Sequence, residues 1–175
     1  MPSRLRVPLG YLFGVVALTL ARPRLASLEV GLPIALLGEA VRIWASGHIE
    51  KTRTLATGGP YALCRNPLYF GSLLLALGVA AAAASPWVVL AGGLYFLAFY
   101  PAVMRDEAAF LRAKFPSAYD EWSREVPLFL PRLTPGGPRA SRFDWSRVRA
   151  NREWRTLAAL PLLALLLYAR GALLP

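Results

Sequence analysis

The 175-residue chain has the length of one domain, and its 56% hydrophobic and 17% charged residues indicate a membrane protein. The formal net charge of +10 comes from residues that lie between apolar segments, which favours anionic lipid headgroups over nucleic acid as the partner. The single cysteine, Cys64, excludes an intrachain disulfide.

Five apolar segments are long enough, or nearly so, to cross a bilayer, which takes about 20 residues. In chain order they are Leu5–Ala21, Leu25–Ser46, Pro67–Ser85, Pro86–Met104 and Leu157–Leu174. The first is interpreted as a retained anchor and not as a signal peptide, because it ends in Ala21-Arg22-Pro23-Arg24 instead of a small-residue cleavage site. We therefore expect an all-α fold, a polytopic membrane helical bundle of about five transmembrane helices with short cytosolic amphipathic helices.

The third and fourth of these helices are expected to form a tight antiparallel hairpin. Ser85 suits the cap and Pro86 the first position of the fourth helix, which leaves almost no loop between them. Small residues on both sides, among them Gly78, Gly92 and Gly93, would let the two backbones approach closely.

The placement of Lys and Arg predicts the topology. With the N-terminus in the cytosol, the loop 53–66 and the whole stretch 105–155 are cytosolic, and only Arg22, Arg24 and Arg170 lie on the opposite side. The residues that could form one polar site are then on one side of the membrane.

The cytosolic stretch is expected to continue as two short amphipathic helices. The first covers Asp106–Lys114, and the second restarts after Pro116 with Ser117 as its cap and two acidic residues in its first turn. Tyr119, Trp122 and Val126 fall on one face of the second helix, which predicts that it lies against the headgroups or covers the site. Residues 134–141, rich in Pro, Gly and Arg, are expected to form a linker.

The polar run RTLATGGPYALCRNPLYFG (residues 53–71) holds the strongest candidate site. Asn66 is a good N-cap and Pro67 a favoured first helical residue, so a helix start with unpaired N–H groups should lie beside Arg65 and attract a small anionic group. Glu107, after the fourth helix, could bind an ammonium group, although a solvated charge is an equally simple interpretation. Together the two would clamp a zwitterion such as an amino-acid head, with contacts from Tyr61 and Tyr69.

Other chemistries find little support in the residues. One His and one Cys do not build a zinc site, so no metal is expected, and a Ser-His-Asp hydrolase lacks its G-x-S-x-G motif. His48 is interpreted as an interfacial polar residue. Glu39 and Arg42 lie three apart on one helix face, and both an internal ion pair and a functional role stay open.

Two blocks resemble the isoprenylcysteine carboxyl methyltransferase and phospholipid methyltransferase superfamily. GGPYALCRNPLYFGS resembles its G-P-Y-x-x-x-R-[HN]-P-x-Y-x-G signature, and RDEAAFLRAKFPSAYDEWSREVPLFLP resembles its C-terminal signature of a paired acid followed by Leu, Phe, Tyr and P-x-x-x-P. The resemblance covers about residues 42–131. The two blocks are fairly specific in combination, whereas each alone is weak.

The resemblance implies an integral membrane enzyme that binds S-adenosylmethionine at the cytosolic face and methylates a lipid-like or small apolar acceptor, releasing S-adenosylhomocysteine. By position, the cofactor contacts would be Arg53, Thr54, Leu55, Ala56, Tyr61, Asn66, Pro67, Leu68, Tyr69 and Glu107. Arg105 is the candidate for orienting an anionic acceptor headgroup, and no catalytic base is assigned. The single membrane domain would comprise N-terminal helices (1–52), the cofactor-binding core (53–133) and a linker with an extra helix (134–175).

Two other classes of function remain open. A membrane reductase of the sterol-reductase type, using NADPH, shares a similar C-terminal signature, but the R-N-P-x-Y block favours the methyltransferase. A non-enzymatic membrane protein whose basic tail binds anionic lipid would not account for the polar motif. The acceptor, the methylated atom, the oligomeric state and the role of the last helix are not readable from the sequence.

Overall fold

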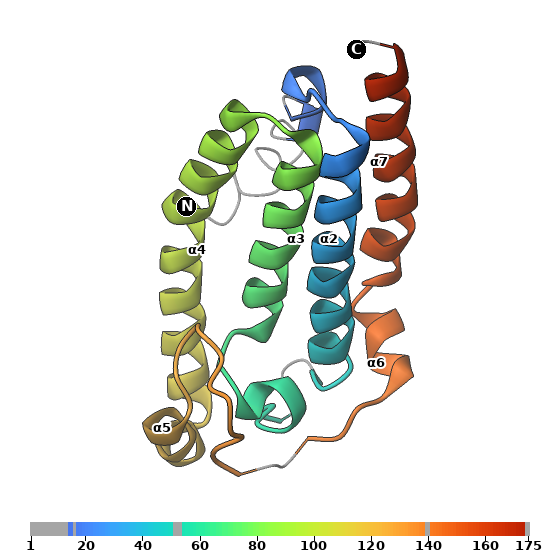
Figure 1. The fold of residues 1–175 in the computed structure, drawn as a ribbon. Helices are drawn as coiled ribbons and strands as arrows, with labels where there is room; N and C mark the ends of the chain where they lie inside the picture. Colours follow the sequence, from blue (N-terminus) through green and yellow to red (C-terminus); the bar gives the residue numbers. More distant parts are fainter. Residues whose placement is uncertain (1–13, 16, 51–53, 139–140, 174–175) are drawn as a thin grey trace. The chain divides into compact units, whose positions relative to one another are not determined.

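The structure is a computed structural model that describes residues 14–15, 17–50, 54–138 and 141–173. Its elements are α2 (Leu25–Ser46), the 3-10 helix η1 (Gly59–Ala62), α3 (Pro67–Ala83), α4 (Pro86–Lys114), α5 (Pro116–Glu125), α6 (Trp145–Ala150) and α7 (Trp154–Leu173) (Figure 1). The described residues contain no strand, so the all-α prediction is confirmed. Most of the predicted segment Leu5–Ala21 lies outside the described residues, although residues 14–15 and 17–20 are helical.

The chain forms two compact units, each made of separate stretches of sequence. The first, called the apolar unit here, comprises Met1–Gly38, Leu73–Val103 and Thr156–Pro175. The second, called the polar unit, comprises Glu39–Ser72 and Met104–Arg155. The predicted polar motif and the predicted cytosolic helices therefore belong to one unit.

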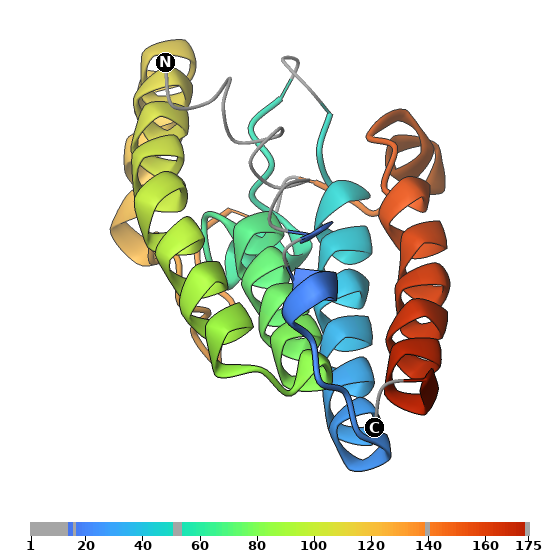
Figure 2. The same ribbon diagram turned by 90° about the horizontal axis from the view of Figure 1, so that it is seen from above.

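In the apolar unit, parts of four helices run side by side in the order α4, α3, α2, α7 (Figures 1 and 2). Its core is built mainly from small residues and a few larger ones: Ala17, Ala21, Leu28, Ala80, Ala82, Ala83, Val88 and Leu167. The closest backbone approach is between α2 and α3, because a Cβ atom added at Gly31 or Gly78 would collide with the backbone of the other helix. Gly93 was expected to let α3 and α4 approach closely. This expectation is wrong, because a Cβ atom added at Gly93 would meet open space.

The turn between α3 and α4 is as short as predicted. Ala84 adopts a left-handed conformation with φ 48° directly after α3 ends, and α4 begins at Pro86. The backbone oxygen of Ser85 accepts hydrogen bonds from the N–H groups of Val88 and Val89 at 3.1 and 3.2 Å. A reversal of the chain within two residues follows from the Ser-Pro pair.

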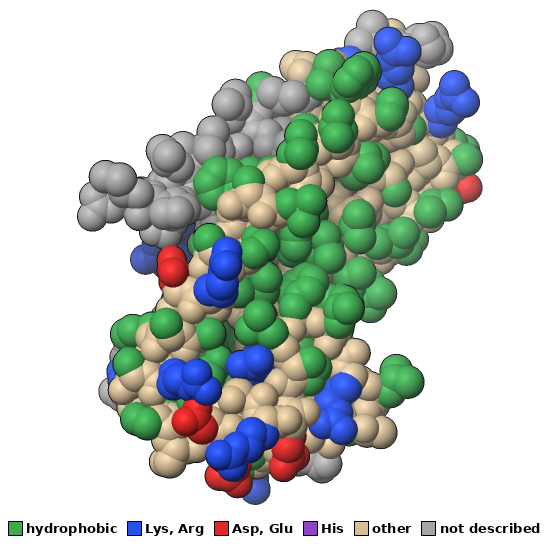
Figure 3. Space-filling model, turned by 90° about the vertical axis from the view of Figure 1, so that its left-hand side faces the viewer, with side chains coloured by type: hydrophobic (Ala, Val, Ile, Leu, Met, Phe, Trp, Pro, Cys, Tyr) green, Lys and Arg blue, Asp and Glu red, His purple; other side chains and the backbone are tan. Residues whose placement is uncertain are grey.

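Among the described residues, α4 and α7 are the two helices long and apolar enough to cross a membrane. α3 is apolar but has 17 residues, and the 22 residues of α2 include the charged Glu29, Glu39 and Arg42. Large hydrophobic side chains on α4 are exposed, among them Trp87, Val89, Leu90, Leu94 and Leu97, and Figure 3 shows a wide hydrophobic area of this kind. These surfaces suit a lipid environment, and the five-span topology stays a prediction.

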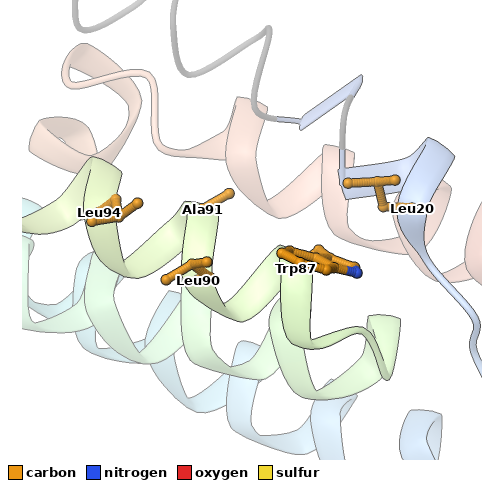
Figure 4. A pocket seen from close by; sticks show the side chains of 5 residues that line it. All are labelled: Leu20, Trp87, Leu90, Ala91 and Leu94. Carbon is orange, nitrogen blue, oxygen red and sulfur yellow. The ribbon is translucent and has the colours of Figure 1, made fainter.

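An apolar groove lies on the surface of the apolar unit. Its volume is about 360 Å³, and Leu20 faces four α4 residues across it: Trp87, Leu90, Ala91 and Leu94 (Figure 4). The indole N–H of Trp87 is the one polar side-chain group among these lining residues, so the groove is almost entirely apolar.

Two expectations about the stretch that was predicted to be cytosolic are wrong in detail. Asp106–Lys114 is not a separate helix but the continuation of α4, because Met104-Arg105-Asp106-Glu107-Ala108 contains no residue that breaks a helix. α5 begins at Pro116 with Phe115 in the cap position, so Ser117 is not the cap and the first turn holds no acidic residue. Pro116 sets this start, since its fixed φ suits the first helical position.

Candidate functional site

A cavity of about 220 Å³ lies within the polar unit. Its lining comes from the loop that follows α2, from the end of α4 and from α5: Ile49, Glu50, Thr54, Leu55, Ala56, Tyr61, Arg65, Glu107, Phe110, Leu111, Lys114, Phe115 and Trp122. Two carboxylates and two cations thus line a space that is otherwise apolar and aromatic. Such a mixture is typical of ligand sites, where a few polar groups orient a molecule that apolar groups enclose.

One face of α4 supplies four of the lining residues. Glu107, Phe110, Leu111 and Lys114 recur at the spacing that places side chains on one side of a helix. They reach the cavity because α4 continues past residue 104. The acidic and the basic group of this face therefore have fixed positions on one rigid element.

The loop wall of the cavity is held by α5. Tyr119, Trp122 and Val126 are buried in one cluster with Tyr61, which confirms the predicted apolar face of this helix. Trp122 Nε1 donates a hydrogen bond to the backbone oxygen of Tyr61 at 2.9 Å, and Arg65 Nη1 donates to Tyr119 Oη at 2.8 Å. α5 therefore covers the site and fixes both Tyr61 and Arg65.

Tyr61 is buried, and this burial raises the pKa of its hydroxyl well above the usual value, with the Glu107 carboxylate adding to the shift. The hydroxyl group therefore stays protonated at neutral pH and can donate a hydrogen bond. Cys64 is buried as well, and burial raises the pKa of its thiol to about 11. A protonated, buried thiol is not a candidate nucleophile.

The helix start at Asn66-Pro67 is present as predicted. α3 begins at Pro67, and the backbone oxygen of Asn66 accepts hydrogen bonds from the N–H groups of Tyr69 and Phe70 at 3.1 and 3.0 Å. The Asn66 side chain is buried and donates to the backbone oxygen of Leu128 at 2.9 Å. This amide therefore fastens the start of α3 to the segment after α5.

A hydrogen bond joins the first turn of α3 to the acidic group on α4. Tyr69 Oη donates to Glu107 Oε2 at 2.9 Å. The two residues are 38 positions apart in the chain, and each belongs to one of the two motif blocks. Since Glu107 also lines the cavity, this contact brings the two blocks to one place.

Only some of the residues expected to hold the cofactor line the cavity. Five line the cavity, namely Thr54, Leu55, Ala56, Tyr61 and Glu107. Asn66, Pro67, Leu68 and Tyr69 are not among the lining residues, and neither is Arg105, which is exposed on α4. Arg53 lies outside the described residues. The roles of all these residues as ligand contacts stay predictions.

Several lining residues had not been assigned to the site, notably Glu50, Phe110, Lys114 and Phe115. The signal for the two α4 residues was present in the sequence, because they follow Glu107 at helical spacings of three and seven. The predicted helix Asp106–Lys114 already contained all three residues at this spacing, so the break expected near Met104 does not explain the omission. Nothing in the sequence places Glu50 beside Glu107, since this proximity comes from tertiary packing.

Arg42 is the centre of a second polar cluster in the same unit. Its guanidinium lies 3.4 Å from Glu39 Oε2 and 2.7 Å from Glu153 Oε2, and it donates a hydrogen bond to the hydroxyl of Ser72. Glu39 is 1% exposed. The ion pair between Glu39 and Arg42 is therefore present, and it ties α2 to α3 and to the residue before α7.

Gly59 lies in a turn that only a residue without a side chain fits well. Its φ is +58°, and an added Cβ would collide with the imidazole ring of His48, whose Nδ1 lies 2.9 Å from the backbone oxygen of Trp44. We expect Gly59→Ala to lower the free energy of unfolding by about 1–3 kcal/mol, as strained backbone positions do. Thermal unfolding in detergent measures this change.

Gly93→Ala is the matched control for this prediction. Gly93 is inside α4, and a Cβ there would meet open space, so alanine should raise helix stability by about 0.5–1 kcal/mol. Equal melting temperatures for the two variants would contradict the assigned strain at Gly59.

Metal chemistry has no visible basis in the part of the chain that the structure describes. Within those ranges, no group of three or more His, Cys, Asp or Glu residues is arranged to hold a metal ion. The lining of the cavity instead offers carboxylates for ammonium or hydroxyl donors, and Arg65 and Lys114 for an anionic group. Such a set suits a zwitterionic ligand.

Comparison with known proteins shows a similarity to one family of membrane enzymes. Residues 34–118 match the family model described as phospholipid methyltransferase. The resemblance predicted from the two motif blocks is therefore confirmed, and it supports a membrane methyltransferase. No solved structure matches the chain significantly.

Curated relatives carry two kinds of name. The cobalt-zinc-cadmium resistance protein CzcN of Cupriavidus metallidurans is 42% identical over 107 residues, which are 60% of this chain and 48% of that protein. The nickel-cobalt-cadmium resistance protein NccN of Alcaligenes xylosoxydans xylosoxydans is 35% identical, over 62% of this chain and 52% of that protein. A probable protein-S-isoprenylcysteine O-methyltransferase of Oryza sativa is 31% identical, over 58% of this chain and 60% of that protein. The chain thus spans about half the length of the first two relatives.

Proposed function

We propose that this chain, whose residues 34–118 match the family model described as phospholipid methyltransferase, is an integral membrane methyltransferase. It moves a methyl group from S-adenosylmethionine to a lipid-like or small apolar acceptor at the cytosolic face of the membrane. The observation that carries the proposal is the hydrogen bond between Tyr69 and Glu107, which joins the two motif blocks at the cavity.

The residues around the cavity fit the proposed cofactor. S-adenosylmethionine has an ammonium and a carboxylate at its methionine end, a ribose with two hydroxyls in the middle and an adenine base at the other end. Glu50 and Glu107 can accept hydrogen bonds from the ammonium or the hydroxyls, and Arg65 and Lys114 can pair with the carboxylate. Leu55 and the aromatic lining would enclose the apolar parts.

The size of the cavity is also informative. Its volume of about 220 Å³ is smaller than the ~300–1,000 Å³ that complete ligand sites occupy. A cavity of this volume holds only part of a ligand as large as S-adenosylmethionine.

The chain's own residues have the task of binding and alignment. When bound, S-adenosylmethionine supplies an electrophilic methyl group on a positively charged sulfur. Tyr69 holds the Glu107 carboxylate by a hydrogen bond, and Phe110, Phe115 and Trp122 give the cavity beside it an aromatic lining. Alignment of two reactants alone can lower a barrier by ~7–11 kcal/mol. Arg105, exposed two residues before Glu107, is assigned to an anionic group of the acceptor.

Ligand-dependent thermal unfolding of the full chain in detergent tests the proposal. We expect S-adenosylmethionine and S-adenosylhomocysteine to raise the melting temperature and NADPH to leave it unchanged. A ligand present at 100 times its dissociation constant adds about 2.7 kcal/mol to the stability of the folded state. Stabilisation by NADPH alone would contradict the methyltransferase proposal and favour a reductase. Stabilisation by none of the three ligands would contradict the assignment of the cofactor.

A further inference from the structure

The segment 141–155 lies beyond the residues that match the family model, yet it packs against the loop that lines the cavity. The first contacts are with glycines of this loop. Ser141 Oγ accepts a hydrogen bond from the N–H of Gly58 at 2.9 Å, and the N–H of Asp144 donates to the backbone oxygen of Gly47 at 2.9 Å. Both ends of the stretch 47–58 are thereby held by the same segment.

An aromatic contact supports these hydrogen bonds. The ring of Phe143 packs edge-on against His48, with centroids 5.9 Å apart. A Cβ atom added at Gly47 would collide with the Phe143 ring, and one at Gly58 would collide with the backbone oxygen of Ser141. The loop and the segment therefore fit together at van der Waals distance over several residues.

α6 reaches the cavity itself through one ion pair. Arg147 Nη2 lies 3.3 Å from Glu50 Oε2, and Glu50 lines the cavity. A second hydrogen bond, from Arg147 Nη1 to the backbone oxygen of Arg142 at 2.9 Å, restricts the guanidinium. The Glu50 carboxylate is thus paired with a residue that does not itself line the cavity.

The far end of the segment is fastened to α2. Asn151 Nδ2 donates to the backbone oxygen of Ser46 at 3.0 Å, and Glu153 pairs with Arg42 at 2.7 Å. Asp144 caps α6 by accepting a hydrogen bond from the N–H of Ser146 at 2.7 Å. Because α6 is fixed at its start and just after its end, Arg147 has a fixed place from which to hold Glu50.

We propose that residues 141–155 are a positioning segment of the cofactor site and that Arg147 acts there by orienting the Glu50 carboxylate toward the bound cofactor. The proposal rests on the proposed function. Residues 141–155 lie after the residues that match the family model, and the proposal gives them a direct role in ligand affinity. Arg147 is the positioning residue of this segment.

Calorimetric titration of the full chain in detergent with S-adenosylhomocysteine tests this role. We expect Arg147→Gln to weaken binding about three- to fivefold, the range that a partly exposed ion pair can supply. Arg149→Gln removes the same charge from an exposed position of the same helix and should bind as the wild type does. Arg147→Lys keeps a charge near Glu50 and should recover most of the affinity.

A double-mutant cycle separates positioning from a general loss of stability. Glu50→Gln and Glu50→Gln/Arg147→Gln should bind with the same affinity, because Arg147 acts through Glu50. Melting temperatures of Arg147→Gln and Arg149→Gln should agree. Wild-type affinity in Arg147→Gln, equal losses in both arginine variants, or additive effects in the cycle would overturn the inference alone. A wild-type chain that does not bind S-adenosylhomocysteine would overturn the proposed function and the inference with it.

Discussion

Glu107→Ala is expected to weaken S-adenosylmethionine binding roughly ten- to hundredfold while the protein stays folded in detergent. Hydrogen bonds to charged groups contribute about 1.5–3 kcal/mol each, and the substitution removes the carboxylate that faces the cavity from α4. Glu107 is exposed to solvent apart from its bond to Tyr69, so its loss should cost little stability. Isothermal titration calorimetry measures the change in affinity.

Asp106→Ala is the matched control for this prediction. Asp106 is the preceding residue on α4, is exposed and does not line the cavity, so its variant should keep wild-type affinity. Tyr69→Phe removes only the hydroxyl that orients Glu107 and should give a smaller loss than Glu107→Ala. Unchanged affinity in Glu107→Ala, or an equal loss in Asp106→Ala, would refute the role of Glu107 in binding an ammonium or hydroxyl group.

Arg42→Met is expected to destabilise the fold by about 3–5 kcal/mol, which is the cost of leaving a buried charge without its partner. Arg42 faces two carboxylates, and Glu39 is almost completely buried. For a chain of this length the melting temperature should fall by roughly 6–20 °C. Thermal unfolding of the full chain in detergent provides the measurement.

A compensating substitution shows whether the buried charge is the cause. Glu39→Gln/Arg42→Met leaves no charge at position 39 and should regain a substantial part of the lost stability. Glu29→Gln, an exposed carboxylate on the same helix, should have little effect. If the double variant is no more stable than Arg42→Met, the interpretation of the cluster as a charge-balanced anchor is wrong.

The helix boundaries that could be predicted from the sequence are those set by local chemistry. Leu25–Ser46 matches α2, and the starts at Pro67 and Pro86 match those of α3 and α4, because proline fixes φ at the first position of a helix. The face of α5 was also predictable, since Tyr119, Trp122 and Val126 are apolar at helical spacing in a polar helix. Each of these features depends on residues that are close to one another in the sequence.

The parts of the site that could not be predicted depend on contacts between distant residues. The end of α4 was placed too early, because a change from apolar to charged residues marks the end of a membrane segment but not of a helix. Glu50 and Arg147 lie 97 positions apart, and no local pattern brings them together. The comparisons confirm the resemblance to the family over residues 34–118, whereas the ligand contacts remain predictions.

The burial of Cys64 has a practical consequence. It is the only cysteine of the chain, it is 1% exposed, and it lies between Tyr61 and Arg65, which both line the cavity. A maleimide reagent needs an accessible thiolate, so it reacts only when this part of the molecule opens. The rate of alkylation therefore reports how often the wall of the cavity opens, and the wild-type chain carries this chemical reporter without any engineered label.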